Sequence, residues 1–288
     1  MLQIIIIILA VAFILYTILG GADFGAGILE IFAGRRGERT VSKAIAPVWE
    51  ANHVWLILAI VIIFTGFPLV YATLSLSLHI PLMVVLIGIV LRGTAFTFRY
   101  YDVSPDKTHK YFTSFFEISS FITPFFLGIT LGAMILGDIP PDNAGSFSER
   151  FILPWFNLFC VAMGLFTIAI FGYIAAVFLT GEAKNTPEQR KYSRLSKIFL
   201  SSTFAMGLLV FLSAEYNNRH LLADFFGSVL CIISFSLVIL LIPVIFYLVN
   251  HPKTIYLRIA IGAQVALIIF GWFAMQFPVI IFEKGGTH

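Results

Sequence analysis

Acidic side chains occur inside apolar stretches of this 288-residue chain, where an unpaired charge is costly. Asp23 lies in the apolar run from Leu2 to Ala33, and Glu30 follows seven residues later. Seven residues make nearly two helical turns, so the two carboxylates share one face of a helix. Buried carboxylates either pair with a positive charge or exchange protons, and both kinds of chemistry need polar partners on neighbouring helices.

Candidate partners lie in three later apolar stretches, at Glu50, Arg92 and Glu117. Arg92 and Arg99 are also seven residues apart and share a helix face. We expect Arg92 to pair with at least one carboxylate, because a lone buried charge costs several kcal/mol. Both arginines are assigned to structural ion pairs, and Arg99 is also expected to be an ordinary anchor at the end of its stretch.

Two interpretations of these residues remain open. Carboxylic acids kept neutral by desolvation could pass protons along a polar relay, formed by Asp23, Glu50 and Glu117 with Asn52, His53, Thr94 and Thr97. The same charges could instead form an ion-paired plug that fixes the register of neighbouring helices. Gly20, Gly27 and Gly34 repeat beside the Asp23 face and would let a neighbouring helix approach closely.

The composition indicates which elements hold these residues. Apolar residues make up 59% of the chain and charged residues only 11%. A soluble domain carries roughly 25% charged residues, and a helix needs about 20 residues to cross a membrane. The sequence therefore predicts an all-α integral membrane protein with about eight transmembrane helices, at 3–33, 50–73, 78–99, 112–137, 152–180, 196–214, 222–249 and 256–282.

The charges in the loops predict the orientation of these spans. Fourteen of the 18 Lys and Arg residues fall in or beside the odd-numbered loops, and only three fall on the other side. Basic loops stay in the cytoplasm, so both termini are expected outside. Asp23, Glu50, Arg92 and Glu117 then all lie in the cytoplasmic half of the first four spans.

A faint internal repeat relates the two halves of the chain. The first and fifth spans run in the same direction, and each ends in small residues followed by a long basic loop. This pattern predicts two four-helix bundles, at 1–140 with the buried acids and at 141–288, related by an axis along the membrane normal.

Other kinds of site are disfavoured by residue type and spacing. Cys160 and Cys231 lie in apolar spans without a CxxC or Cys/His pattern, which argues against a disulfide framework or a zinc site. His53 and His79 are expected at opposite ends of their spans, so they could not ligate one haem together. Glu50 and His53 fit a Glu-x-x-His pattern, but a di-iron bundle needs two such motifs.

Three motifs give the chain a family resemblance: residues 21–27 (GADFGAG), 46–56 (APVWEANHVWL) and 91–99 (LRGTAFTFR). With the late Gln276-Phe277-Pro278, they make the chain similar to subunit II of cytochrome bd-type quinol oxidases. The resemblance covers nearly the whole chain and is densest in residues 18–137.

The resemblance implies a heterodimeric terminal oxidase that oxidises quinol and reduces dioxygen to water in a bacterial or archaeal plasma membrane. Haems b and d and the quinol-oxidising loop are then expected in the partner, subunit I, and no cofactor, metal or catalytic residue in this chain. Membrane lipid and a small single-helix subunit are further candidate partners, whereas nucleic acid is not. The resemblance also implies a cytoplasmic proton pathway, with the family's acidic positions carried over to Asp23 and Glu50.

The sequence departs from its relatives in three places. Some relatives carry an acid where Gly20 stands, and they usually carry one where Thr97 stands. Longer relatives also continue beyond the Phe-Pro of residues 277–278 with another peripheral helix, which is not expected here.

Two other functions fit parts of this pattern. A stand-alone proton-coupled secondary transporter would also show buried acids and a repeat, but its site usually lies at the midplane between broken helices. A haem-binding cytochrome b would give the isolated chain a Soret band, and we expect none.

We predict that Glu117 replaces the acid missing at Thr97, since the third and fourth spans are neighbours. Changing Glu117 to Gln should slow turnover of the oxidase while its assembly stays intact. Oxygen uptake by a complex purified in normal yield measures this effect, and unchanged uptake would contradict the prediction.

Overall fold

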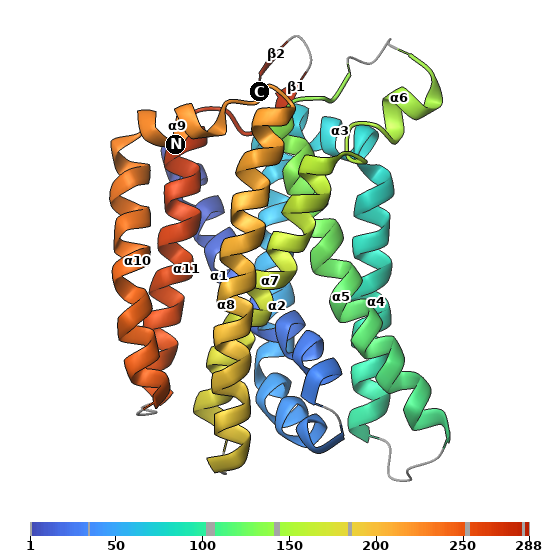
Figure 1. Cartoon of the computed structure of the whole chain (residues 1–288). Coiled ribbons are helices and arrows are strands. Elements are labelled where there is room, and N and C mark those ends of the chain that lie inside the picture. The colour runs from blue at the N-terminus through green and yellow to red at the C-terminus, as the bar shows by residue number, and fades with distance from the viewer. Residues whose placement is uncertain are drawn as a thin grey trace.

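The structure, a computed structural model, describes residues 2–33, 35–101, 107–140, 145–183, 186–250, 254–283 and 286–287. Long helices run roughly side by side and form the body of the protein (Figure 1): α1 (Leu2–Ala33), α2 (Arg35–Gly66), α4 (His79–Tyr101), α5 (Lys107–Leu136), α7 (Leu158–Glu182), α8 (Thr186–Tyr216), α10 (Val229–Asn250) and α11 (Thr254–Gln276). Short elements lie at one end of this body: α3 (Pro68–Ser77), α6 (Phe147–Phe151), α9 (Leu221–Gly227) and the strands β1 (Phe282–Glu283) and β2 (Gly286–Thr287).

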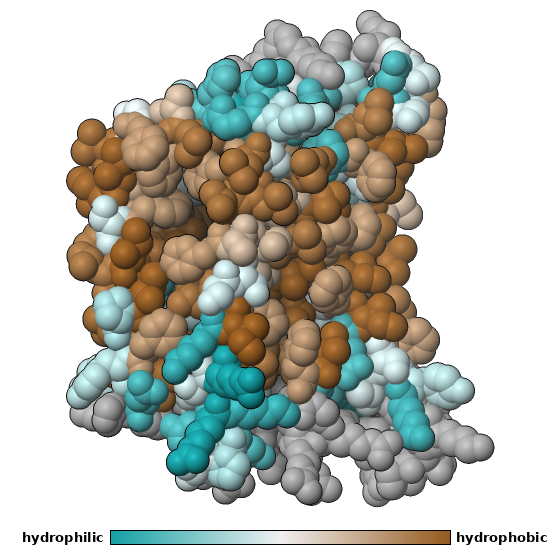
Figure 2. Space-filling view, in the orientation of Figure 1, coloured by the Kyte–Doolittle hydropathy of each residue, from teal (hydrophilic) through white to brown (hydrophobic). Residues whose placement is uncertain are grey.

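Length and hydropathy identify most of the long helices as membrane spans. Seven described helices are long and apolar enough to cross a membrane, and an eighth span results if the bent pair Ala51–Gly66 and Pro68–Ser77 counts as one. Figure 2 shows apolar side chains in a broad belt across the visible face, with hydrophilic side chains near the two ends. The predicted helical membrane fold with about eight spans is confirmed, apart from a two-stranded hairpin near the C-terminus.

The span predicted at 50–73 is not one straight helix. α2 ends at Gly66, and α3 continues at an angle of 113° to it. Phe67, between them, has φ −135° and ψ 63°, outside the helical region. The ring of Pro68 disfavours a helical conformation at the residue before it. The apolar residues continue through this bend, which is why hydropathy predicted a single span.

The span predicted at 222–249 is divided at Ser228 into α9 and α10. Other predicted spans differ at their ends, and α8 begins at Thr186 rather than at 196. The fifth begins at Leu158 rather than at 152, because Asn157 caps α7 and its Oδ1 accepts a hydrogen bond from the Cys160 amide at 2.9 Å. The last span ends at Gln276 rather than at 282. Beyond it, Phe282 and Glu283 pair antiparallel with Thr287 and Gly286.

Both ends of the chain lie at the same end of the helical body (Figure 1). α4, α7 and α10 end at the opposite end, where α5, α8 and α11 begin. The basic first turns of α8, with Arg190, Lys191 and Arg194, belong to this opposite end. The assignment of that end to the cytoplasm stays a prediction from the positive-inside rule.

α7 is the central helix of the body. Within the most apolar stretch of α7, 72% of the residues are buried, compared with 22% in the corresponding stretch of α10. α7 packs against α1, α5 and α8. Both apolar core clusters combine residues from 1–140 with residues from 141–288. The division into two four-helix bundles at those boundaries stays a prediction.

A glycine allows α1 to approach α7 closely. A Cβ atom at Gly25 would overlap the carbonyl oxygen of Phe171 and lie 2.8 Å from the Ala175 Cβ. One turn earlier, a Cβ at Gly21 would lie 2.7 Å from the Ile174 side chain. Glycines at such positions let two membrane helices bring their backbones together.

Changing Gly25 to Ala should therefore lower the thermal stability of the protein, because overpacking of this kind costs about 1–3 kcal/mol. The matched control is Gly262→Ala in α11, where a new Cβ would lie 3.8 Å from its nearest neighbour, the Ile18 Cδ1. Thermal unfolding in detergent measures both variants. Equal melting temperatures for the two would contradict the prediction.

Candidate functional site

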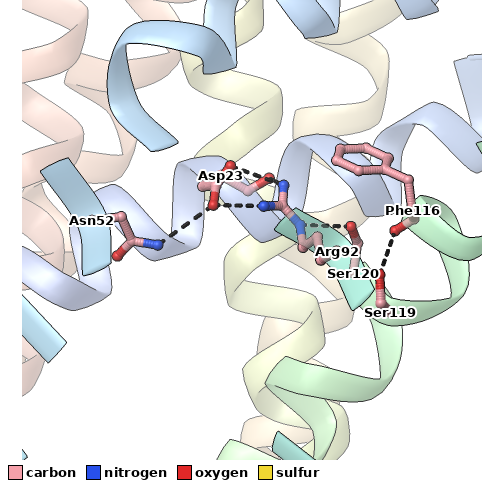
Figure 3. A network of polar contacts seen from close by, with 6 residues as sticks. All are labelled: Asp23, Asn52, Arg92, Phe116, Ser119 and Ser120. Carbon is pink, nitrogen blue, oxygen red and sulfur yellow. Dashed lines mark hydrogen bonds and ion pairs between the residues drawn. The ribbon is translucent and has the colours of Figure 1, made fainter. Parts of the chain in front are cut away.

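Two buried ion pairs connect α1 and α4. Arg92 Nη1 lies 2.7 Å from Asp23 Oδ2 and Arg92 Nη2 lies 2.8 Å from Asp23 Oδ1, so the guanidinium contacts both carboxylate oxygens (Figure 3). Two turns further along, Arg99 Nη1 and Nη2 donate to Glu30 at 2.8 and 3.2 Å. All four residues are at most 7% exposed. The carboxylate that we expected to find beside Arg92 is Asp23.

We call these two pairs the ion-pair ladder. The partners are 69 residues apart in both pairs, so the seven-residue spacing on α1 matches the spacing on α4. The two helices therefore run in the same direction here, and the pairs lie about 10 Å apart along them.

Aromatic rings cover the guanidinium groups of the ladder. The Cζ of Arg92 lies 4.7 Å from the ring centroids of both Phe24 and Phe116. The Cζ of Arg99 lies 4.4 Å from the Phe116 centroid, so this fully buried ring of α5 contacts both arginines. Cation–π contacts contribute about 2 kcal/mol when the cation is desolvated, which favours keeping the two charges inside.

α5 also binds Arg92 through a serine. Arg92 Nε donates to Ser120 Oγ at 2.9 Å, and its Nη2 donates to the Asp23 carbonyl oxygen at 2.8 Å (Figure 3). Gly27 of α1 makes room for this contact, since a Cβ there would overlap the Ser120 side chain. The neighbouring Ser119 donates to a carbonyl of its own helix instead.

α2 reaches the ladder through Asn52. Its Nδ2 donates to Asp23 Oδ2 at 3.5 Å, a long hydrogen bond, and the residue is fully buried (Figure 3). Its Oδ1 lies against Gly20, where a Cβ would be only 3.0 Å away. The half-buried His53 lies close enough to Asp23 and Arg92 to interact electrostatically with both.

The other residues of the predicted relay lie in α4, α5 and α2. Thr97 is exposed, and its hydroxyl donates to the Gly93 carbonyl of its own helix at 2.9 Å. Thr94 is bonded to its own helix in the same way. Glu117 is half-buried in α5, directly after Phe116, and its role stays a prediction. Glu50 falls within α2, but its side chain lies outside the described residues.

Arg99, which the sequence assigned to a structural ion pair, lies in the last turn of α4, and its buried guanidinium is paired with Glu30. Its role as an anchor at the cytoplasmic end stays a prediction. The common spacing of the two acids and the two arginines contained the signal for this second pair. Sequence reasoning missed Phe116 and Ser120 altogether, because their residue types are unremarkable in an apolar span.

The ladder is better suited to hold helices than to exchange protons. Protonating Asp23 would break its contact with Arg92 and leave the guanidinium buried without a counter-charge, which costs several kcal/mol. Among the described residues, no three His, Cys, Asp or Glu side chains are grouped so that they could hold a metal ion.

Sequence comparisons with known proteins find one family. The family model described as cytochrome bd terminal oxidase subunit II matches residues 1–286. The chain is 27% identical over 219 residues to the cytochrome bd ubiquinol oxidase subunit 2 of Bacillus subtilis, covering 74% of this chain and 64% of that protein. It is 29% identical over 133 residues to the cytochrome bd-I ubiquinol oxidase subunit 2 of Escherichia coli, covering 46% of this chain and 35% of that protein.

The chain thus aligns with less than two thirds of the length of these curated relatives. A solved structure of the bd oxidase from Geobacillus thermodenitrificans has a chain of the same fold. The TM-score is 0.77 at 20% sequence identity, and the match covers 100% of this chain and 89% of that one.

Removing one member of the Asp23–Arg92 pair should destabilise the protein strongly, since breaking a buried pair costs about 3–5 kcal/mol. Arg92→Gln and Asp23→Asn should each lower the melting temperature and the yield of folded protein. The double variant should recover much of this loss, because it leaves no buried charge unpaired.

The control for this double-mutant cycle is Glu215→Gln, whose partner His220 is 71% exposed, because exposed pairs contribute about 0–1 kcal/mol. A double variant whose loss equals the sum of the two single losses would show that the pair is not the source of the effect.

Proposed function

Because the chain belongs to the cytochrome bd terminal oxidase subunit II family, we propose that it serves as subunit II of a membrane complex that oxidises quinol and reduces dioxygen to water. The family match over residues 1–286 is the observation that carries this proposal. The spans and the fold shared with a bd oxidase support it, and a bacterial plasma membrane is the proposed location. No observation favours a stand-alone transporter.

In this proposal the haems belong to a partner, subunit I, and this chain supports that partner. His53 and His79, the two histidines of the first four spans whose side chains are described, lie apart. His53 is near the ion-pair ladder. His79 is the first residue of α4, and its ring centroid lies 5.1 Å from that of Phe151. Two ligands of one haem would have to face each other across a pocket, and these two do not.

We further propose that protons for dioxygen reduction pass along α2 toward the ladder. Glu50 is the acid that takes up protons, and His53 and Asn52 lie one turn or less beyond it along the chain. Asp23 holds Asn52 in place through its hydrogen bond and keeps its charge paired with Arg92. Glu117, which follows Phe116 in α5, is the second candidate acid.

Purification of the chain from its native membrane tests the main proposal. A haem-bearing partner should co-purify with the chain, and the preparation should consume oxygen when quinol is added. A colourless homo-oligomer without quinol-dependent oxygen uptake would overturn it.

Changing Glu50 to Gln should slow oxygen uptake several-fold without reducing the haem content or yield of the complex, because the amide cannot take up a proton. Glu188→Gln, which alters an acid in the first turn of α8, is the matched control and should leave the rate unchanged. Normal oxygen uptake in the Glu50 variant would contradict the proposed route while leaving the assignment to the oxidase untouched.

A further inference from the structure

Two buried polar atoms near the ion-pair ladder have no hydrogen-bond partner among the described residues: Tyr16 Oη and Asn52 Oδ1. Tyr16 is 5% exposed and Asn52 is fully buried. A polar group left buried and unsatisfied is unfavourable, because it has lost its hydrogen bond to water and gained none in the protein. In most proteins an internal water molecule satisfies groups of this kind.

Tyr16 lies on the face of α1 that Asn52 of α2 contacts. Tyr16 and Gly20 are one helical turn apart, so they are neighbours on the helix surface. The Asn52 Oδ1 lies against Gly20. Tyr16 is also close enough to Asp23 and Arg92 to interact electrostatically with both. The unsatisfied atoms therefore share one region, at the contact of α1 with α2 beside the Asp23 carboxylate.

We propose that this region binds ordered water, as one molecule or a short chain, between Tyr16 and Asn52. A water molecule can accept from the Tyr16 hydroxyl and donate to the Asn52 Oδ1, which satisfies both groups at once. Its second hydrogen can reach an Asp23 oxygen, since an ionised carboxylate offers about four acceptor positions. The site thus extends the polar network of the ladder toward the N-terminal half of α1.

A third unsatisfied atom in the described helices, the Thr123 hydroxyl, is not part of this site. It belongs to α5 and lies against Gly88 of α4, where a Cβ would overlap it. The water site concerns only the α1–α2 contact. It holds whether or not protons pass through the chain, so it goes beyond the proposed function.

Radiolytic hydroxyl-radical labelling of the purified native complex tests this site, because water bound inside a protein produces radicals next to the side chains that it contacts. Tyr16 should be oxidised several-fold faster than its small exposed area allows. Tyr173 is the matched reference residue, since it is 4% exposed but its hydroxyl donates to Gln264 at 3.1 Å. Mass spectrometry of the peptides measures both rates.

Asn52→Leu should bring the labelling of Tyr16 down to that of Tyr173, because it removes the second partner of the water. An electron-density map of the unmodified complex, at a resolution that shows ordered water, provides a measurement that needs no variant. Density between Tyr16 Oη and Asn52 Oδ1 would support the site. Equal labelling of Tyr16 and Tyr173, or a Tyr16 hydroxyl bonded directly to a protein acceptor, would overturn it.

Discussion

A charge inside a membrane needs a counter-charge, and in this protein that requirement determines how three helices meet. The carboxylates of α1 and the guanidinium groups of α4 satisfy each other in pairs, and α5 supplies the ring and the hydroxyl that complete their surroundings. Neither α1 nor α4 could move away from the other without leaving charges unpaired. The first half of the fold therefore depends on the ion-pair ladder.

α1 also packs against α7, in the second half of the chain, and its glycines make this close packing possible. Gly27 admits Ser120 of α5 on one side, and Gly25 admits the backbone of α7 on another. A helix with larger residues at these positions could carry the charges, but it could not stand so close to both neighbours. Small residues and buried charges are thus two parts of one packing arrangement.

Much of this could be predicted from the sequence, and the remainder shows where sequence reasoning loses information. Hydropathy located the spans, and the seven-residue spacing put Asp23 with Glu30 and Arg92 with Arg99 on common faces. The pairing itself depends on which helices are neighbours and on their relative register, neither of which a single sequence contains. For that reason Glu30 and Arg99 were not recognised as partners. The bend at Pro68 had a local signal, but the continuous apolar run concealed it.

The equal spacing of the two ion pairs also has a mechanical consequence. A single contact would act as a pivot, about which α4 could tilt while the charges stayed together. Two contacts about 10 Å apart resist tilting as well as sliding, and the Phe116 ring of α5 contacts both guanidinium groups. We therefore expect α1, α4 and α5 to move as one rigid unit, rather than as three independent helices, under lateral pressure from the bilayer.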